Sequence, residues 1–188
     1  MKKSFLLLLL FFISCSKEQK PIENKLKEQK PMENKRSAIM QSLRLEAITT
    51  GNDGAYGNYI DFANQEHDYY DLLSLSLIMH HKYQNEKSYY QIYKAMVEVN
   101  SGVAYNRRHL EHLNDADRNL AVYYLTKGAQ NNSIDCQATL EQIYRNGYGK
   151  KVETEKSDSI YRILENNKAI GDFYRSNREN KGNVDEIN

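Results

Sequence analysis

The 188-residue sequence predicts an all-α domain of about six to eight helices. Three observations lead to this prediction. Apolar residues beyond Asp53 recur at intervals of three and four, which is the period of an amphipathic helix. The period-two alternation of a half-buried strand is not sustained anywhere. Both prolines, Pro21 and Pro31, lie near the N-terminus, so no proline interrupts the region where the helices are expected.

The helices are expected in pairs joined by short polar links. One helix lies within 37–50, and the others cover 69–83, 85–99, 115–130, 135–147 and about 153–167. Asn85 is expected to cap the start of one helix, and Gly147 the end of another. Residues 101–114 form the one longer link. The glycines of the segment TGNDGAYGN, Gly51, Gly54 and Gly57, lack a P-loop lysine and a preceding strand, so they predict a turn.

The two helix pairs share a sequence pattern. Gln91-Ile92-Tyr93 and Gln142-Ile143-Tyr144 are 51 residues apart, and each falls in the second helix of a pair. Repeated helix pairs bury their apolar faces by stacking on each other. The sequence therefore predicts a helix-turn-helix repeat, with an irregular helical bundle as the alternative.

The stretch from Ala121 to Leu164 resembles a Sel1-like repeat, a helix pair related to the tetratricopeptide repeat. The matching residues are Ala121, Tyr123, Tyr124, Lys127, Ala129, Ala138, Leu140, Tyr144, Gly147, Gly149 and Val152. Residues 55–97 form a more degenerate copy. Leu140 falls one place early, Lys150 and Lys151 are inserted before Val152, and Ser157 replaces the usual alanine. The resemblance implies a Sel1/TPR-like α-solenoid.

The pattern of the N-terminal residues predicts a targeting signal. Residues 1–14, MKKSFLLLLLFFIS, predict a signal peptide, because the apolar run after the two lysines is too short to cross a bilayer. Ser14 before Cys15 resembles the lipobox of bacterial lipoproteins, in which the cysteine is lipidated and becomes the new N-terminus; Phe12 stands where leucine is usual. An ordinary cleavage site with an accidental cysteine is the alternative.

The resemblance to lipoproteins implies a location. A membrane protein held by acyl chains such as palmitate in the cell envelope is expected, and Ser16 in place of an aspartate favours the outer membrane. Lys17 and Glu18 resemble a surface-export signal of Bacteroidetes lipoproteins, although Gln19 departs from it. The periplasmic and the surface face both remain open.

The segment after Cys15 predicts a charged tether, residues 15–36. It contains the tandem decapeptides KEQKPIENKL and KEQKPMENKR, and residues 16–36 hold seven Lys or Arg and four Glu, a net charge of +3. So few apolar residues predict a flexible, solvated stalk; contact with anionic lipid is the alternative. The helical-repeat domain then covers 37–175, and 176–188 form a polar C-terminal tail.

The sequence contains no set of residues that predicts catalysis, and no cofactor or metal is expected. The net charge is only +1, so no overall positive potential is expected to attract nucleic acid. His109 and His112 have the spacing of a ligand pair, but they are expected in a solvated loop. His80 and His81 are expected to complement a helix C-terminus. Cys136 is expected to be a small packing residue.

Clustered tyrosines are the candidate protein-binding residues. Tyr69, Tyr89, Tyr90 and Tyr123 belong to adjacent tyrosine pairs, in which one ring can face the core and the other a groove. Tyrosine supplies rigid contact area with a polar tip at interfaces. Packing between repeats is the equally weighted alternative.

The leading functional hypothesis is a lipid-anchored adaptor that binds a protein or peptide through a tyrosine-lined face. An immunity lipoprotein that binds a toxin is a specific version of this hypothesis. Two other classes remain open: a cell-wall glycan enzyme that uses Glu111, Asp115 and Asp117 as carboxylates, and a spacer with no partner.

Overall fold

The computed structural model describes residues 20–102 and 105–182, with side chains for 35–102 and 105–176. The predicted signal peptide and the lipidation of Cys15 lie outside these residues. By backbone proximity the chain divides between Ser42 and Leu43 into two compact units. The second unit contains the helical-repeat region.

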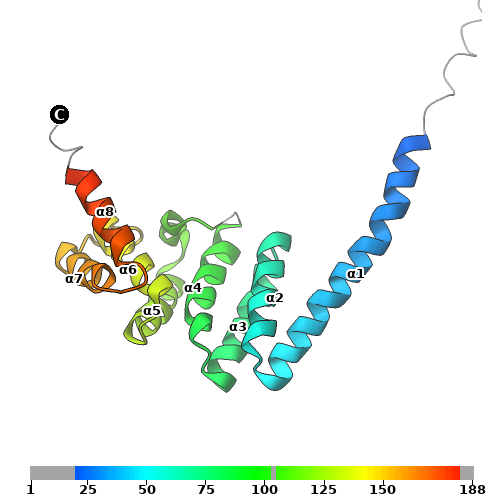
Figure 1. Ribbon diagram of the computed structural model, residues 1–188, viewed down its shortest axis with the longest axis horizontal. Coiled ribbons are helices and arrows are strands. Elements are labelled where there is room, and N and C mark those ends of the chain that lie inside the picture. The colour runs from blue at the N-terminus through cyan, green and yellow to red at the C-terminus, as the bar shows by residue number, and fades with distance from the viewer. Residues whose placement is uncertain (1–19, 103–104, 183–188) are drawn as a thin grey trace, which may run out of the picture. The chain divides into compact units, whose positions relative to one another are not determined.

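The described residues form eight α-helices and one 3-10 helix, without a strand (Figure 1). In chain order they are α1 (Lys20–Thr50), α2 (Asp53–Glu66), α3 (Tyr69–Tyr83), α4 (Glu86–Ser101), η1 (Arg107–His112), α5 (Asp115–Gln130), α6 (Ile134–Asn146), α7 (Thr154–Glu165) and α8 (Gly171–Gly182). The all-α fold class predicted from the sequence is confirmed.

Successive helices from α2 to α8 pack against each other in consecutive pairs (Figure 1). α4 also contacts η1 and α6, so the second helices of the two predicted pairs lie close together. Gln91-Ile92-Tyr93 and Gln142-Ile143-Tyr144 occur in these two helices, and both isoleucines are fully buried. The architecture is that of a helix-turn-helix repeat solenoid; its assignment to Sel1-like repeats stays a prediction.

The structure corrects the prediction of a flexible coil for the charged tether. Lys20 to Arg36 belong to the single helix α1. Pro21 lies in the first turn, where its missing N–H has no intrahelical partner to lose. Pro31 removes one bond in the interior, but the surrounding Lys, Glu, Gln and Met are strong helix formers, and Glu23 stands four residues before Lys27. No helix in the described part of the chain is long and apolar enough to cross a bilayer.

Local capping explains where the helices begin and end. Asn85 Oδ1 accepts from Lys87 N at 3.0 Å, and Gly147 ends α6 with a φ of 75°, as the sequence predicts. Gly51 forms the turn between α1 and α2 with a φ of 71°, and a Cβ there would overlap the ring of Tyr83. The turn prediction is wrong for Gly54 and Gly57, which lie within α2.

One hydrophobic core lies where α4, η1, α5 and α6 meet. Its buried residues are Ile92, Tyr93, Met96, Val97, Leu110, Leu113, Ala121, Val122, Tyr124, Leu125, Cys136, Leu140 and Ile143. Burial of apolar surface is the main favourable term in folding, so these contacts hold the two helix pairs together. Gly128 lets α5 approach closely, because its Cβ position lies 2.8 Å from Tyr89 Cβ.

Candidate binding pocket between α4 and α6

A pocket of about 370 Å³ opens between the beginning of α4 and the beginning of α6. Its lining residues come from these two first turns and from the link before α6: Glu86, Lys87, Tyr90, Gln91, Asn132, Ser133, Ile134 and Asp135. Pockets of roughly this size hold small ligands or single side chains. Asn132 bends the link with a φ of 63°, a left-handed conformation that asparagine tolerates.

Gln91 lines the pocket, but its amide oxygen is not exposed there. Gln91 Oε1 is buried and has no hydrogen-bond partner among the described residues. Its counterpart one repeat later, Gln142, accepts a hydrogen bond from Arg107 Nη1. Two glutamines at matching places in the repeat therefore differ: Arg107 donates to the second, whereas the buried amide oxygen of the first has no partner in the described residues.

The charged residues of the pocket are mostly acidic. Glu86 and Asp135 are exposed and form no ion pair within the described part of the chain. Lys87 Nζ lies 2.5 Å from Asp53 Oδ2, so this cation is already neutralised. The hydrogen bonds from Lys87 and Asn85 lower the pKa of Asp53, which keeps its carboxylate charged. The lining side chains therefore carry a net negative charge, which the N-terminal ends of α4 and α6 partly offset.

A cluster of three tyrosines, Tyr90, Tyr93 and Tyr105, extends from the pocket. The ring centres of Tyr90 and Tyr105 are 6.4 Å apart, and those of Tyr93 and Tyr105 are 6.0 Å apart, both edge to face. Burial raises the pKa of Tyr93 to about 12, and burial also raises that of Tyr90. All three hydroxyls are thus neutral near pH 7, and the rings form a stable aromatic wall.

The structure places the four predicted tyrosines at separate positions. Tyr90 lines the pocket. Tyr89 packs between helices, edge to face with His80 at 4.6 Å. Tyr69 has its hydroxyl 2.7 Å from His67 Nδ1 at the start of α3. Tyr123 is 52% exposed on α5. Of the four, Tyr90 lines the pocket between α4 and α6, and the other three do not.

His80 does not have the role that was predicted for it at the end of α3. Its ring is half-buried between Tyr89 and Tyr124, at 4.6 and 5.5 Å from their ring centres. Burial, with a smaller effect of His81, lowers the pKa of His80. A neutral ring packed between helices is therefore favoured over a cation that complements the helix end, and this corrects the prediction for His80. His81 is exposed.

The predicted loop histidines and acids have local roles. His109 and His112 stack in η1 with ring centres 5.3 Å apart. The described residues contain no group of three or more His, Cys, Asp or Glu placed to hold a metal ion. Asp115 pairs with Arg118 at 3.0 Å. Asp117 N donates to the capping side chain of Asn114 at 3.0 Å, and Glu111 is exposed.

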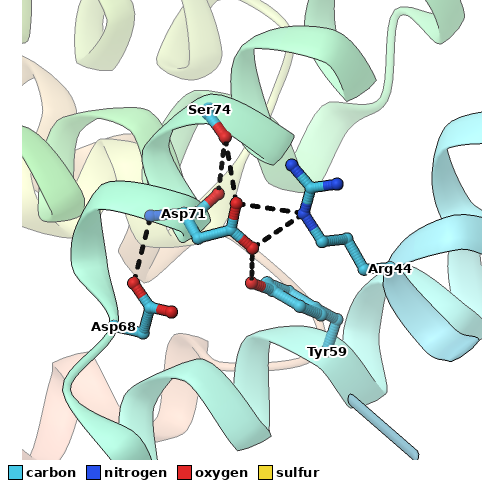
Figure 2. Close-up of polar contacts among 5 residues, drawn as sticks. All are labelled: Arg44, Tyr59, Asp68, Asp71 and Ser74. Atoms are coloured by element: carbon cyan, nitrogen blue, oxygen red, sulfur yellow. Dashed lines mark hydrogen bonds and ion pairs between the residues drawn. The ribbon is translucent and has the colours of Figure 1, made fainter. Parts of the chain in front are cut away.

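A second polar cluster joins α1, α2 and α3 (Figure 2). The carboxylate of Asp71 accepts from Arg44 Nε at 2.7 and 3.0 Å and from the Tyr59 hydroxyl. Burial raises the pKa of Asp71, but the bonds from Tyr59 and Arg44 outweigh it, so that the pKa is lowered. Because Tyr59 is fully buried and the acceptor is occupied, this cluster is a structural joint rather than a binding site.

A buried acid lies at the far end of α4. Glu98 is 2% exposed, its Oε1 accepts from Tyr105 N at 3.0 Å, and its Oε2 has no hydrogen-bond partner in the described residues. Burial raises its pKa. Lys94 reaches Asn64 Oδ1 at 2.7 Å. The opening beside Gln91 places a buried unpartnered acceptor in a residue that lines a pocket, so it is the stronger candidate.

The comparisons with known proteins identify neither a family nor a function for the chain. No family model, curated protein or solved structure matches the chain. The geometry of the pocket is therefore the basis for the functional proposal. The sequence analysis found Tyr90 and missed Gln91, although the repeat offset between Gln91 and Gln142 was the signal that could have found it.

Proposed function

We propose that the chain is a lipid-anchored helical-repeat adaptor of the bacterial envelope that binds a segment of a partner protein in the pocket between α4 and α6. One observation carries the proposal. The pocket is lined by Tyr90 and by Gln91, whose buried amide oxygen has no partner among the described residues. Interface anchors commonly unite such aromatic area with a few placed polar groups.

The helical-repeat fold supports this proposal. Stacked helix pairs present pairs of neighbouring helices along their surface, and proteins of this architecture use such surfaces for binding. The lipid anchor at Cys15 rests on the lipobox resemblance and would hold the adaptor at a membrane. An immunity lipoprotein that binds a toxin is one form of this adaptor.

A site-specific crosslinking experiment tests the proposal. p-Benzoylphenylalanine is placed at Asn132, which lines the pocket, or at Tyr70, which is 73% exposed and does not line it. The full chain is irradiated with envelope fractions and with secretions of competing strains. We expect one protein to crosslink from position 132 and not from position 70, and its saturable binding to fall at least about tenfold with Gln91→Ala.

Gln91→Ala is the informative variant because Gln91 Oε1 has no internal partner in the described residues, so its loss should leave the fold intact. Tyr123→Ala on α5 is the control, since Tyr123 does not line the pocket. Absence of a crosslink at 132, or equal binding by the Gln91 variant, would contradict the adaptor proposal.

The anchor is tested separately. Cys15→Ser should remove the acyl chains and move the protein from the membrane to the soluble fraction, with mass spectrometry of the mature N-terminus as the readout. An unmodified N-terminus in the wild-type protein would contradict the lipoprotein part of the proposal alone.

A further inference from the structure

The buried carboxyl group of Glu98 joins the last turns of α4 to the segment that precedes η1. Glu98 is 2% exposed. Its Oε1 accepts from Tyr105 N at 3.0 Å, whereas its Oε2 is buried and has no hydrogen-bond partner in the described residues. A buried carboxylate is stable when hydrogen bonds or a cation satisfy both of its oxygens. The charged form of Glu98 therefore lacks part of the stabilisation that it needs.

Titratable and charged side chains face this carboxyl group from three directions: Lys94 on α4, Tyr69 on α3 and His67 at the end of α2. Lys94 Nζ donates to a side-chain oxygen of α2 at 2.7 Å, and the Tyr69 hydroxyl lies 2.7 Å from His67 Nδ1. Each of these side chains thus has a hydrogen bond elsewhere. Burial raises the pKa of Glu98 above 4.5, its ordinary value, because the surrounding donors and cations offset only part of this effect.

Tyr105 connects Glu98 to the wall of the pocket between α4 and α6. The ring of Tyr105 lies edge to face with the rings of Tyr90 and Tyr93, at 6.4 and 6.0 Å between ring centres. Its hydroxyl lies 3.4 Å from that of Tyr93. Tyr90 in turn lines the pocket. The hydrogen bond from Tyr105 N to Glu98 therefore helps to fix the ring that packs against Tyr90.

The strength of this hydrogen bond depends on the charge of Glu98. Hydrogen bonds to an ionised group are roughly twice as strong as those between neutral groups. Uptake of a proton at Oε2 removes the charge, which weakens the bond at Oε1 and removes the cost of an unpartnered charged oxygen. One proton from solvent is thus enough to change how firmly Tyr105 is held, and the step needs no other reactant.

We propose that Glu98 is a pH-sensitive switch: the ionised carboxylate holds Tyr105 firmly and the neutral acid holds it weakly, so that the aromatic wall of the pocket shifts when a proton binds. This wall consists of Tyr90, Tyr93 and Tyr105. Because the folded pKa is raised, the stabilising effect of the neutral acid is complete below 4.5 and is lost as the pH rises through the folded pKa. The inference goes beyond the proposed function and requires no partner protein.

A pH titration of the full chain by NMR tests this switch. The carboxyl carbon of Glu98, assigned through its own side-chain protons, reports its ionisation, and the Tyr105 amide and the Tyr90 ring report the wall. We expect Glu98 to titrate above 4.5, and the signals of Tyr105 and Tyr90 to follow with the same midpoint. Hydrogen exchange of the Tyr105 amide, corrected for its intrinsic pH dependence, should be about fivefold faster with the neutral acid.

Matched variants separate the charge of Glu98 from its shape. Glu98→Gln keeps an acceptor but carries no charge, so the Tyr105 amide should stay at its low-pH position at every pH. Tyr69→Phe should raise the pKa of Glu98 further, because the lost hydroxyl favours the charged form. Glu155→Gln is the control, since Glu155 is an exposed acid in the first turn of α7, and this variant should leave the titration unchanged.

Two outcomes would overturn the inference: titration of Glu98 at or below 4.5, or Tyr105 and Tyr90 signals that do not follow it. If Glu98→Gln does not fold, the wild-type titration still decides between these results. The titration involves no partner, so its failure leaves the adaptor proposal to the crosslinking experiment, and a missing crosslink at position 132 leaves the switch unaffected.

Discussion

Arg44 Nε lies 2.7 Å from Asp71 Oδ2, and this contact joins the end of α1 to the first turn of α3. Both side chains are about one-third exposed, at 35% and 31%, so solvent screens part of the attraction. The same carboxylate also accepts from the buried Tyr59 hydroxyl, which places one residue of each of three helices in a single polar joint.

Asp71→Asn should lower the free energy of unfolding by about 1 kcal/mol near neutral pH, because the charged hydrogen bonds are weakened and partly screened. The pKa of Asp71 is lowered in the folded state. Its stabilising effect is therefore complete above its ordinary pKa and is lost as the pH falls through the lower, folded value. Urea denaturation at a series of pH values checks this: the difference between wild type and variant should shrink as the pH falls below the ordinary pKa of aspartate. A pH-independent difference would contradict the role of the charge.

Gly128→Ala should destabilise the protein by about 1–3 kcal/mol, because the new Cβ would overlap Cys136 Sγ and approach Tyr89 Cβ to 2.8 Å. Gly57→Ala is the matched control. Gly57 lies within α2 and its Cβ position is open, with Lys87 Nζ at 3.9 Å as the nearest atom. It should raise stability by about 0.5–1 kcal/mol. Thermal unfolding of both variants measures the contrast, and similar effects of the two would contradict the close approach of α5.

His80 should make stability depend on pH in the mildly acidic range. The pKa of His80 is lowered in the folded state. At mildly acidic pH the imidazole is therefore protonated more often in the unfolded chain than in the folded chain. The stability is complete above the ordinary histidine pKa and falls as the pH drops toward the folded value. Two-dimensional NMR of the imidazole should give a pKa for His80 below 6.5, the ordinary value.

His80→Gln supplies the stability measurement for the same prediction. It should flatten the pH dependence of stability below the ordinary histidine pKa, whereas His81→Gln on the exposed neighbour should change it little. A titration of His80 at or above its ordinary value would show that the ring is not held neutral between Tyr89 and Tyr124.

Cys136 should react slowly with thiol reagents in the folded protein. Its side chain is fully buried, and burial raises its pKa to about 11, so little thiolate forms near neutral pH. In urea the same thiol should react at the rate of an ordinary cysteine. Measurement of the reaction with a chromogenic disulfide checks this, and rapid labelling without denaturant would contradict the buried position.

The amino-acid sequence alone predicted the helices α3 to α7 and most of their boundaries, whereas α2 and α8 were not predicted. Helical periodicity and capping are local properties, so the helix after Asn85 and the end of α6 at Gly147 could be predicted from neighbouring residues. The prediction was wrong where two local preferences compete. Around Pro31 the helix propensity of Lys and Glu outweighs one missing hydrogen bond, and α1 is continuous.

Only the tertiary structure decided which buried polar groups have hydrogen-bond partners and which do not. Gln91 and Gln142 are alike in sequence, but Arg107 reaches only Gln142, because η1 folds against that part of the solenoid. Likewise, a helix turns about 100° per residue, so adjacent tyrosines face different neighbours, and the neighbours depend on how the helices pack. The sequence could therefore name Tyr90 as a candidate, whereas the packing of α4 against α6 placed Tyr90, Gln91, Glu86 and Asp135 around one opening.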